Sequence, residues 1–195
     1  MGCMKECFRR VLRKPLTLLL SLFFEKKYLD GRFFNSQYTG FLWAIRAIWQ
    51  RNILRLSPPM PFPVGLTCVI SDPENLIFHP DDLNNFQTGG TYYQNFAARI
   101  YIGRGTLIAP NVGLITANHD PMHPNLHQKG SDISLGEECW IGMNSIVLPG
   151  VKLGSKTIVA AGSVVTRSFP EGLCIVAGTP ARKIRDLRAT REDLL

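Results

Sequence analysis

Residues 135–170 read LGEECW-IGMNSI-VLPGVK-LGSKTI-VAAGSV-VTRSFP, six consecutive groups of six residues. Each group opens on an aliphatic residue: Leu135, Ile141, Val147, Leu153, Val159 and Val165. A spacing of six matches neither the 3.6-residue period of a helix nor the two-residue period of a simple strand. It predicts a parallel β-helix, in which every aliphatic points into a shared interior and each coil buries its face against the next.

The same spacing extends upstream to Ile102, Ile108 and Leu114, and is then interrupted. Ile102 and Leu135 are 33 residues apart, which is not a multiple of six. The excess lies in residues 118–132, a polar stretch rich in His and Pro. Insertions in repeat folds collect where binding occurs, so we expect this segment to leave the solenoid as a loop that carries the active site.

The net charge of +7 is concentrated near the N-terminus. Residues 1–56 hold 11 Lys or Arg and three acids, a balance of +8, while the other 139 residues hold 11 bases and 12 acids, a balance of −1. A basic arm can meet the phosphates of membrane headgroups or of nucleic acid. Since no nucleic-acid-binding module is recognisable, we expect no nucleic-acid partner.

Two apolar segments in this arm predict helices. Residues 16–24 are largely apolar but about half as long as the ~20 residues that span a bilayer. Charged residues 25–27 follow them in place of a signal-peptide cleavage site. Residues 41–56 place three arginines among aromatic and aliphatic side chains. Two interpretations stay open: the helices lie in a membrane interface, or they pack on the repeat domain or between subunits.

The sequence therefore divides into a basic helical arm at 1–56, a Pro-rich linker at 57–63, a β-helix domain at 64–187 and a tail at 188–195. After the last group of six we expect a turn, a strand and a short basic C-terminal helix. The five cysteines are scattered, with neither zinc-site spacing nor a disulfide framework. We therefore expect a cytoplasmic protein. If the arm lies in a membrane interface, we expect that contact to be peripheral, at the inner face of the cell membrane.

Four segments are similar to a known family: IAPNVGLITANHD, CWIGMNSIVLPGVKLG, VAAGSVVTRSFP and VAGTPARKIR. They resemble the hexapeptide-repeat acyltransferases with a left-handed β-helix, and most closely the maltose, galactoside, nodulation-factor and capsular-polysaccharide O-acetyltransferases. The resemblance covers residues 92–187. It implies three groups of six per coil, acetyl-CoA as the donor, and a homotrimer with active sites between neighbouring subunits.

The resemblance also assigns roles to residues. The family's catalytic histidine falls on His119, and an acceptor-binding asparagine falls on Asn95, with Asn118 and Asp120 beside the histidine as further acceptor contacts. The acetyl-CoA contacts fall on a channel tryptophan, on the coil around it and on the side chains that meet the nucleotide: Trp140, Gly142, Met143, Ala161, Thr166, Arg167, Arg182 and Arg185. The arm lacks the start usual in the sugar acetyltransferases, so acceptor contacts made there do not carry over.

The chemistry of acetyl transfer explains this set of residue types. A thioester is already activated, whereas an acceptor hydroxyl is a very weak acid that needs a general base. Imidazole titrates near neutrality and suits that task, so no metal and no covalent intermediate are expected. Backbone N–H groups of residues 140–145 are candidates to stabilise the oxyanion.

The predicted function is acetyl-CoA-dependent O-acetylation of a saccharide or lipid-linked saccharide during surface-polysaccharide assembly. Two alternatives from other classes stay open. His119, His123 and His127 could hold zinc in a hydrase of the γ-carbonic-anhydrase type, although Pro121 and Pro124 argue against one continuous helix carrying them. A non-catalytic scaffold could dock through the basic arm. Within the acyltransferases, an antibiotic or serine acetyltransferase is the other candidate.

Overall fold

The computed structural model describes residues 13–188, so the predictions for residues 1–12 of the arm and 189–195 of the tail lie outside the described residues. The chain forms two compact units, Met1–Leu66 and Thr67–Leu195, which we call the N-terminal unit and the repeat unit. The division falls three residues after the end of the predicted Pro-rich linker.

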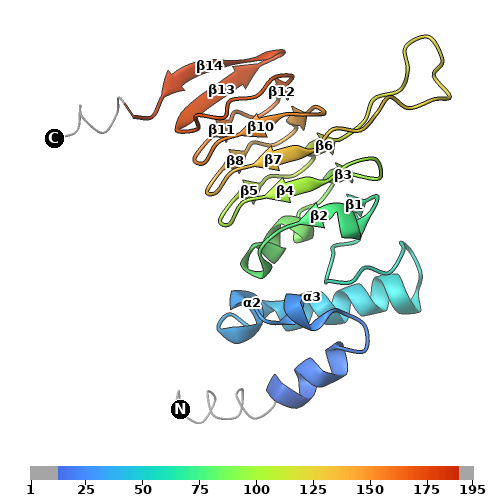
Figure 1. The fold of residues 1–195 in the computed structure, drawn as a ribbon. Coiled ribbons are helices and arrows are strands. Elements are labelled where there is room, and N and C mark those ends of the chain that lie inside the picture. The colour runs from blue at the N-terminus through green and yellow to red at the C-terminus, as the bar shows by residue number, and fades with distance from the viewer. Residues whose placement is uncertain (1–12, 189–195) are drawn as a thin grey trace. The chain divides into compact units, whose positions relative to one another are not determined.

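Three sheets build the repeat unit (Figure 1). The first sheet holds β1 Val69–Ile70, β3 Tyr92–Gln94, β6 Gly113–Ile115, β9 Ile146–Val147 and β12 Val164–Val165. The second holds β2 Leu76–Ile77, β4 Ile100–Ile102, β7 Ile133–Leu135 and β10 Lys152–Leu153. The third holds β5 Leu107–Ile108, β8 Trp140–Ile141, β11 Ile158–Val159, β13 Cys174–Gly178 and β14 Ala181–Asp186.

From β4 to β12 the chain visits the second, third and first sheets in rotation, one short strand in each, and all these strands pair in parallel. This arrangement is a parallel β-helix with three groups of six per coil, and it confirms the predicted fold class. The left hand of the coil stays an expectation from the resemblance.

The six-residue period arises because the opening aliphatic of each group points inward. In the third sheet, Ile108, Ile141, Val159 and Val176 lie in register on successive coils, and each is at least 96% buried. The residue before each points outward, as Leu107 and Trp140 do. Burial of one such aliphatic contributes about 1.5–3 kcal/mol, so the columns supply most of the cohesion between coils.

Small hydroxyl side chains close the corners between sheets. Ser145 donates to the Ala160 carbonyl at 3.1 Å, Thr157 to Gly154 at 2.7 Å and Thr106 to Gly136 at 2.7 Å. All three side chains are buried, so these bonds satisfy both the hydroxyls and the corner carbonyls. These three residues are each the fifth of a group of six, which explains why a small or β-branched side chain occurs at that position.

The first coil departs from the repeat, as the sequence predicts. After the 3₁₀ turn η3 Pro73–Asn75 and strand β2, the chain forms η4 Pro80–Gln87, a 3₁₀ segment, where later coils place a third-sheet strand. Buried Asn85 holds it in place, because its amide donates to the Thr106 carbonyl at 2.8 Å and accepts from the Ile108 N–H at 3.0 Å. One side chain thereby substitutes for strand hydrogen bonds.

The expected C-terminal helix is wrong for the described residues. Residues 181–186 form strand β14, which turns back after Pro180 and pairs antiparallel with β13. At the last coil β13 would otherwise present an unpaired edge, and the returning chain supplies its hydrogen-bond partners. The basic, polar sequence of this segment is compatible with a helix, but the helix prediction did not consider the open edge of β13.

The N-terminal unit is helical, as predicted. Residues 13–20 are helical, and η1 Lys26–Leu29, α2 Arg32–Asn35 and α3 Thr39–Ala47 follow, with α3 continuing into the π-helical segment η2 Ile48–Ile53. The buried Arg51 guanidinium donates to the carbonyls of Pro58, Val64 and Gly65, and so ties η2 to the Pro-rich segment. Over residues 13–188, no helix is long and apolar enough to cross a membrane.

Two neighbouring residues of β5 test the inward columns. Ile108→Ala should lower the free energy of unfolding by about 2–4 kcal/mol, because it leaves a cavity in the column. Leu107→Ala, a matched truncation on the outer face, should cost less than about 1 kcal/mol. Denaturant unfolding measures both, and equal losses would contradict the assigned orientation of the strand.

Candidate active site

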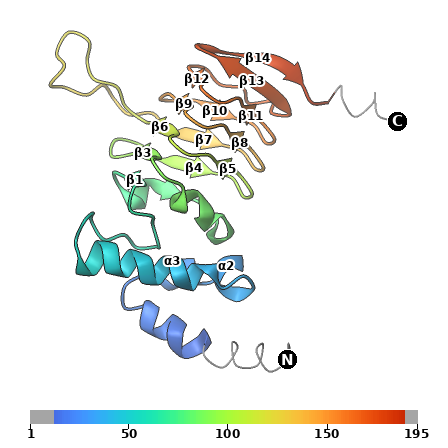
Figure 2. The same ribbon diagram turned by 180° about the vertical axis from the view of Figure 1, so that it is seen from behind.

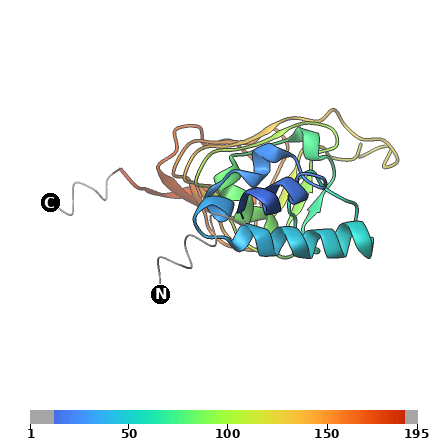
Figure 3. The same cartoon turned by 90° about the horizontal axis from the view of Figure 1, so that it is seen from below.

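The segment between β6 and β7 leaves the solenoid as a two-stranded ribbon, which we call the hairpin loop, residues 116–132 (Figures 1 and 2). Its strands are joined by hydrogen bonds of 2.8 Å from the Ser131 N–H to Thr116, from Gln128 to Asn118 and from Asp120 to Leu126. The view along the solenoid shows the loop extending beyond the coils (Figure 3). This is the segment that interrupts the six-residue spacing of the sequence.

His119 lies on the outgoing strand of the hairpin loop, opposite His127. Its Nδ1 is 2.7 Å from the carbonyl oxygen of Pro124. A carbonyl oxygen can only accept, so Nδ1 carries the proton in this hydrogen bond. In the neutral ring Nε2 is then the basic nitrogen, which is the state that a general base requires.

Two further rings support His119. The His127 ring packs against it with centroids 4.3 Å apart, and Phe96 meets His127 edge-on at 5.0 Å. Together with the Pro124 bond, this row of rings limits the orientations open to the imidazole. Sequence reasoning assigned no role to Phe96 and considered His127 only as a zinc ligand. The position of His127 depends on the register of the ribbon, and its contact with Phe96 depends on where the ribbon lies beside the end of β3. The repeat encodes neither.

Asp120 caps the turn of the hairpin loop. Its Oδ1 accepts the N–H groups of Met122 at 2.8 Å and His123 at 3.0 Å, and it lies 3.7 Å from the His123 Nδ1. These contacts direct the carboxylate to the tip of the hairpin loop. The neighbouring Asn118 is exposed, and its carbonyl is paired with Gln128. The acceptor roles of both residues stay predictions.

The three histidines of the zinc alternative do not converge within one chain. His119 and His127 lie against each other, whereas His123 is at the tip beside Asp120. Among residues 13–188, no three His, Cys, Asp or Glu side chains are grouped closely enough to hold a metal ion. A zinc site on these histidines would need a different conformation of the loop or ligands from another subunit.

Asn95, the predicted acceptor residue, is fully buried and joins two segments of the first coils. Its Oδ1 accepts the Asp72 N–H at 2.9 Å, and its Nδ2 donates to the Asp72 carbonyl. Its own carbonyl accepts the Asn75 side chain at 3.1 Å. The amide therefore has a structural task in this conformation, and sequence alone does not reveal a bond between residues so far apart.

Four of the predicted acetyl-CoA residues, Trp140, Gly142, Met143 and Ala161, lie around the corner between the third and first sheets. Trp140 points outward from β8 with 54% of its surface exposed, and Met143 is 43% exposed at the corner that follows. Gly142 is buried there, and a Cβ on it would lie 2.6 Å from the backbone nitrogen of Ala161. The small residues are thus required by the stacking of coils, whether or not a ligand binds beside them.

The remaining predicted residues lie elsewhere on the solenoid. Thr166 and Arg167 follow β12 at the corner between the first and second sheets, the corner from which the hairpin loop also leaves. Arg182 and Arg185 are exposed on β14 of the third sheet. One chain therefore carries His119 and Trp140 on different edges of the β-helix.

The coil itself uses most of the N–H groups proposed for the oxyanion. The amides of Trp140, Gly142, Asn144 and Ser145 donate to Thr157, Val159, Pro110 and Gly142 respectively, at 2.8–3.3 Å. These four candidate N–H groups are therefore already paired in the coil. Outside strand β8, the N–H of Met143 is the candidate of that turn that remains.

The thiol nearest in sequence to Trp140 is unsuited to covalent catalysis. Cys139 is buried, and this burial raises the pKa of its thiol, which donates to the Gly154 carbonyl at 3.3 Å. A protonated, hydrogen-bonded thiol is a poor nucleophile. Cys139 is therefore a poor candidate to carry an acyl group.

Comparison with known proteins identifies the same repeat. The family model "Bacterial transferase hexapeptide (six repeats)" matches residues 132–167. The galactoside O-acetyltransferase of Escherichia coli strain K12 is 36% identical over 114 residues, 53% of this chain and 55% of the relative. Nodulation protein L of Rhizobium meliloti strain 1021 is 40% identical over 129 residues, 61% of this chain and 67% of the relative.

One similar solved structure is a hexapeptide-repeat acetyltransferase from Vibrio cholerae O1 biovar eltor in complex with acetyl coenzyme A. It is 35% identical with a TM-score of 0.43, and the match covers 46% of this chain and 50% of that one. The matches span about half to two thirds of the length of these proteins.

Substitution of Asp120 tests the cap of the hairpin loop. Asp120→Ala removes the acceptor for two backbone N–H groups, so the Met122 and His123 amides should exchange with solvent about tenfold faster. Asp120→Asn keeps an acceptor oxygen and should retain most of the protection. Hydrogen exchange followed by NMR measures both variants. Similar exchange rates in the wild type and Asp120→Ala would contradict the cap.

Proposed function

This chain belongs to the hexapeptide-repeat transferase family, and we propose that it is an acetyl-CoA-dependent O-acetyltransferase that acetylates a hydroxyl of a saccharide. The observation that carries the proposal is the bond between His119 Nδ1 and the Pro124 carbonyl, because it prepares Nε2 to act as a base. The relative named as a galactoside O-acetyltransferase supports the reaction class and a carbohydrate acceptor.

In this proposal His119 takes the proton of the acceptor hydroxyl through Nε2. The Pro124 carbonyl then faces the Nδ1–H of an imidazolium and stabilises the charge that the ring gains. His127 and Phe96 keep the ring in its plane while the proton moves. A positioned base of this kind contributes about 10²–10⁴-fold to the rate.

The donor supplies an acetyl group that its thioester already activates, so the chain needs only to bind and orient it. We assign the acetyl and pantetheine end to the exposed face of Trp140 and to Met143 beside it. Exposed guanidinium groups of Arg167, Arg182 and Arg185 suit the phosphates of the nucleotide end. The Arg167 guanidinium already lies over the ring of Phe169, 5.3 Å from its centroid, and this contact restricts its orientation.

A homotrimer would bring together the two edges of the β-helix that carry His119 and Trp140. His119 and Trp140 lie on different edges of one β-helix, so a three-fold arrangement that brings the hairpin loop of one subunit to the Trp140 corner of its neighbour completes the site. Apolar side chains exposed on the outer face of the first sheet, such as Val69 and Tyr92, are consistent with contacts between subunits.

The acceptor is proposed to be a saccharide or lipid-linked saccharide of surface-polysaccharide assembly, met in the cytoplasm. The hairpin loop is the surface on which the acceptor would lie, because it carries the base and extends beyond the coils. Asn118 and Asp120 remain the proposed contacts beside the base.

Substitution of the base is the direct test. His119→Ala should lower kcat by about 10²–10⁴-fold, while the assembly state and the affinity for acetyl-CoA, measured by equilibrium dialysis, stay near those of the wild type. His123→Ala, at the tip of the same loop, is the matched control and should keep most of its activity. Turnover of His119→Ala at the wild-type rate would remove His119 from this role.

A further inference from the structure

We infer that the N-terminal unit docks on the surface of an anionic lipid bilayer, through apolar side chains on its helices and the basic residues around them. The inference concerns a different unit from the proposed active site and does not depend on the reaction assigned there. It rests on three observations: an apolar stripe on α3–η2, an excess of basic charge, and hollows lined by basic side chains.

The rod formed by α3 and η2 is apolar on two faces. One face is buried and holds Phe41, Ala44 and Ala47. The other is exposed, with relative exposures of 54–66%. Its members follow one another at intervals of three or four residues and so share one side of the rod: Leu42, Ile45, Trp49 and Ile53. A helix that needed to face only water would carry polar residues there.

The exposed apolar surface continues on other parts of the same unit. Leu18, Leu19 and Leu22 are 58–77% exposed along and just after the first helical segment. Leu54 and Leu56 follow the end of η2 and are also exposed. Proteins that stay in water rarely expose apolar side chains at this density, and such surfaces mark sites for a partner or a membrane.

The charge of this unit points to an anionic occupant. Residues 1–66 carry 11 bases and three acids, a balance of +8. In the described part, the exposed bases greatly outnumber the two acids, Glu25 and Asp30: Lys14, Lys26, Lys27, Arg32, Arg46 and Arg55. Each base near an anionic bilayer strengthens binding, and Trp is favoured at the level of the headgroups.

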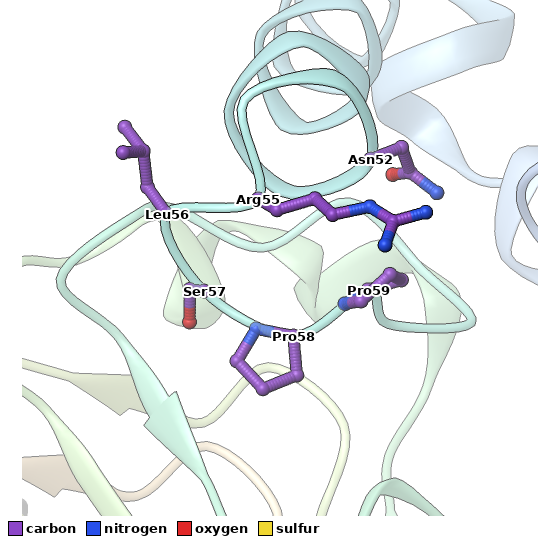
Figure 4. A pocket seen from close by; sticks show the side chains of 6 residues that line it. All are labelled: Asn52, Arg55, Leu56, Ser57, Pro58 and Pro59. Atoms are coloured by element: carbon purple, nitrogen blue, oxygen red, sulfur yellow. The ribbon is translucent and has the colours of Figure 1, made fainter.

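Two hollows in this unit offer places for lipid phosphates. One, of about 450 Å³, is lined by Arg13, Lys14 and Lys26 beside Leu18, with Asp30 3.6 Å from Arg13. The other, of about 650 Å³, lies between the end of η2 and the Pro-rich segment, where Arg55 extends alongside Asn52 and Pro59 (Figure 4). In both, a cation lies beside apolar surface, the pairing that a phospholipid headgroup and its chain present.

Charge also argues against the other occupants. A second copy of the same unit would oppose a net charge of +8 with +8, which disfavours the contact. Residues 67–195 carry 11 bases and 12 acids, a balance of −1, and offer little complementary charge. A bilayer of anionic lipid supplies both negative charge and an apolar layer for the stripe.

Cosedimentation of the full chain with vesicles tests the inference. We expect binding to vesicles of phosphatidylcholine mixed with phosphatidylglycerol, little binding to phosphatidylcholine alone, and weaker binding at high salt. The triple variant Leu42→Ser/Ile45→Ser/Trp49→Ser and the double variant Arg46→Gln/Arg55→Gln should each bind at least about tenfold more weakly. The control, Ile77→Ser/Lys152→Gln on the outer face of the second sheet, should bind within about twofold of the wild type.

Several outcomes would overturn the inference. Vesicle binding that is absent, equal on both lipid mixtures, or unchanged in both variants contradicts it. A change in oligomeric state of the triple variant, with no vesicle binding by the wild type, would assign the stripe to contacts between chains instead. Thermal unfolding checks that the variants are folded. If the triple variant is unfolded, the vesicle binding of the double variant alone decides the test. Acetyl-CoA is absent from the assay, so failure here leaves the proposed reaction untouched.

Discussion

The structure of the repeat unit depends on one packing constraint: the inward residue of every short strand must fill an interior that each coil shares only with its neighbours. Ile108, Ile141, Val159 and Val176 meet this constraint in the third sheet, and equivalent columns do so in the other two. Because three short strands make one coil, the constraint fixes a period of six and requires small residues where coils stack, as at Gly142. Segments between strands are free to lengthen, provided that the strands on either side keep their register.

The hairpin loop is the consequence of that freedom. It departs at β6, returns at β7 and builds its own hydrogen bonds, so its side chains are organised without help from the core. The Pro124 carbonyl selects the tautomer of His119, and His127 and Phe96 restrain its ring. The N-terminal unit differs from the solenoid, since its rod exposes one apolar face while it buries the other.

The β-helical fold and the position of the hairpin loop could be predicted from the sequence, because both follow from the spacing of the aliphatic residues. The features that sequence reasoning missed depend on tertiary contacts that the six-residue spacing does not encode. β14 replaces an expected helix because the last coil leaves an edge to be paired, and the bond of Asn95 to Asp72 joins residues 23 positions apart. The position of His127 against His119 needs the register of a ribbon, and most amides around Gly142 are unavailable to an oxyanion because they bond to neighbouring coils. In each case the missing information is the partner with which a strand, side chain or amide pairs.

In the proposed reaction, a hexapeptide β-helix with a basic histidine on its extruded loop uses acetyl-CoA. We would titrate acetyl-CoA into the metal-stripped, full-length protein and measure the heat of binding. We expect saturable binding with about one donor molecule per chain, at an affinity that physiological donor concentrations can saturate. No heat of binding from acetyl-CoA, together with stability or activity that returns on addition of zinc, would contradict the account and favour a zinc site on the loop histidines.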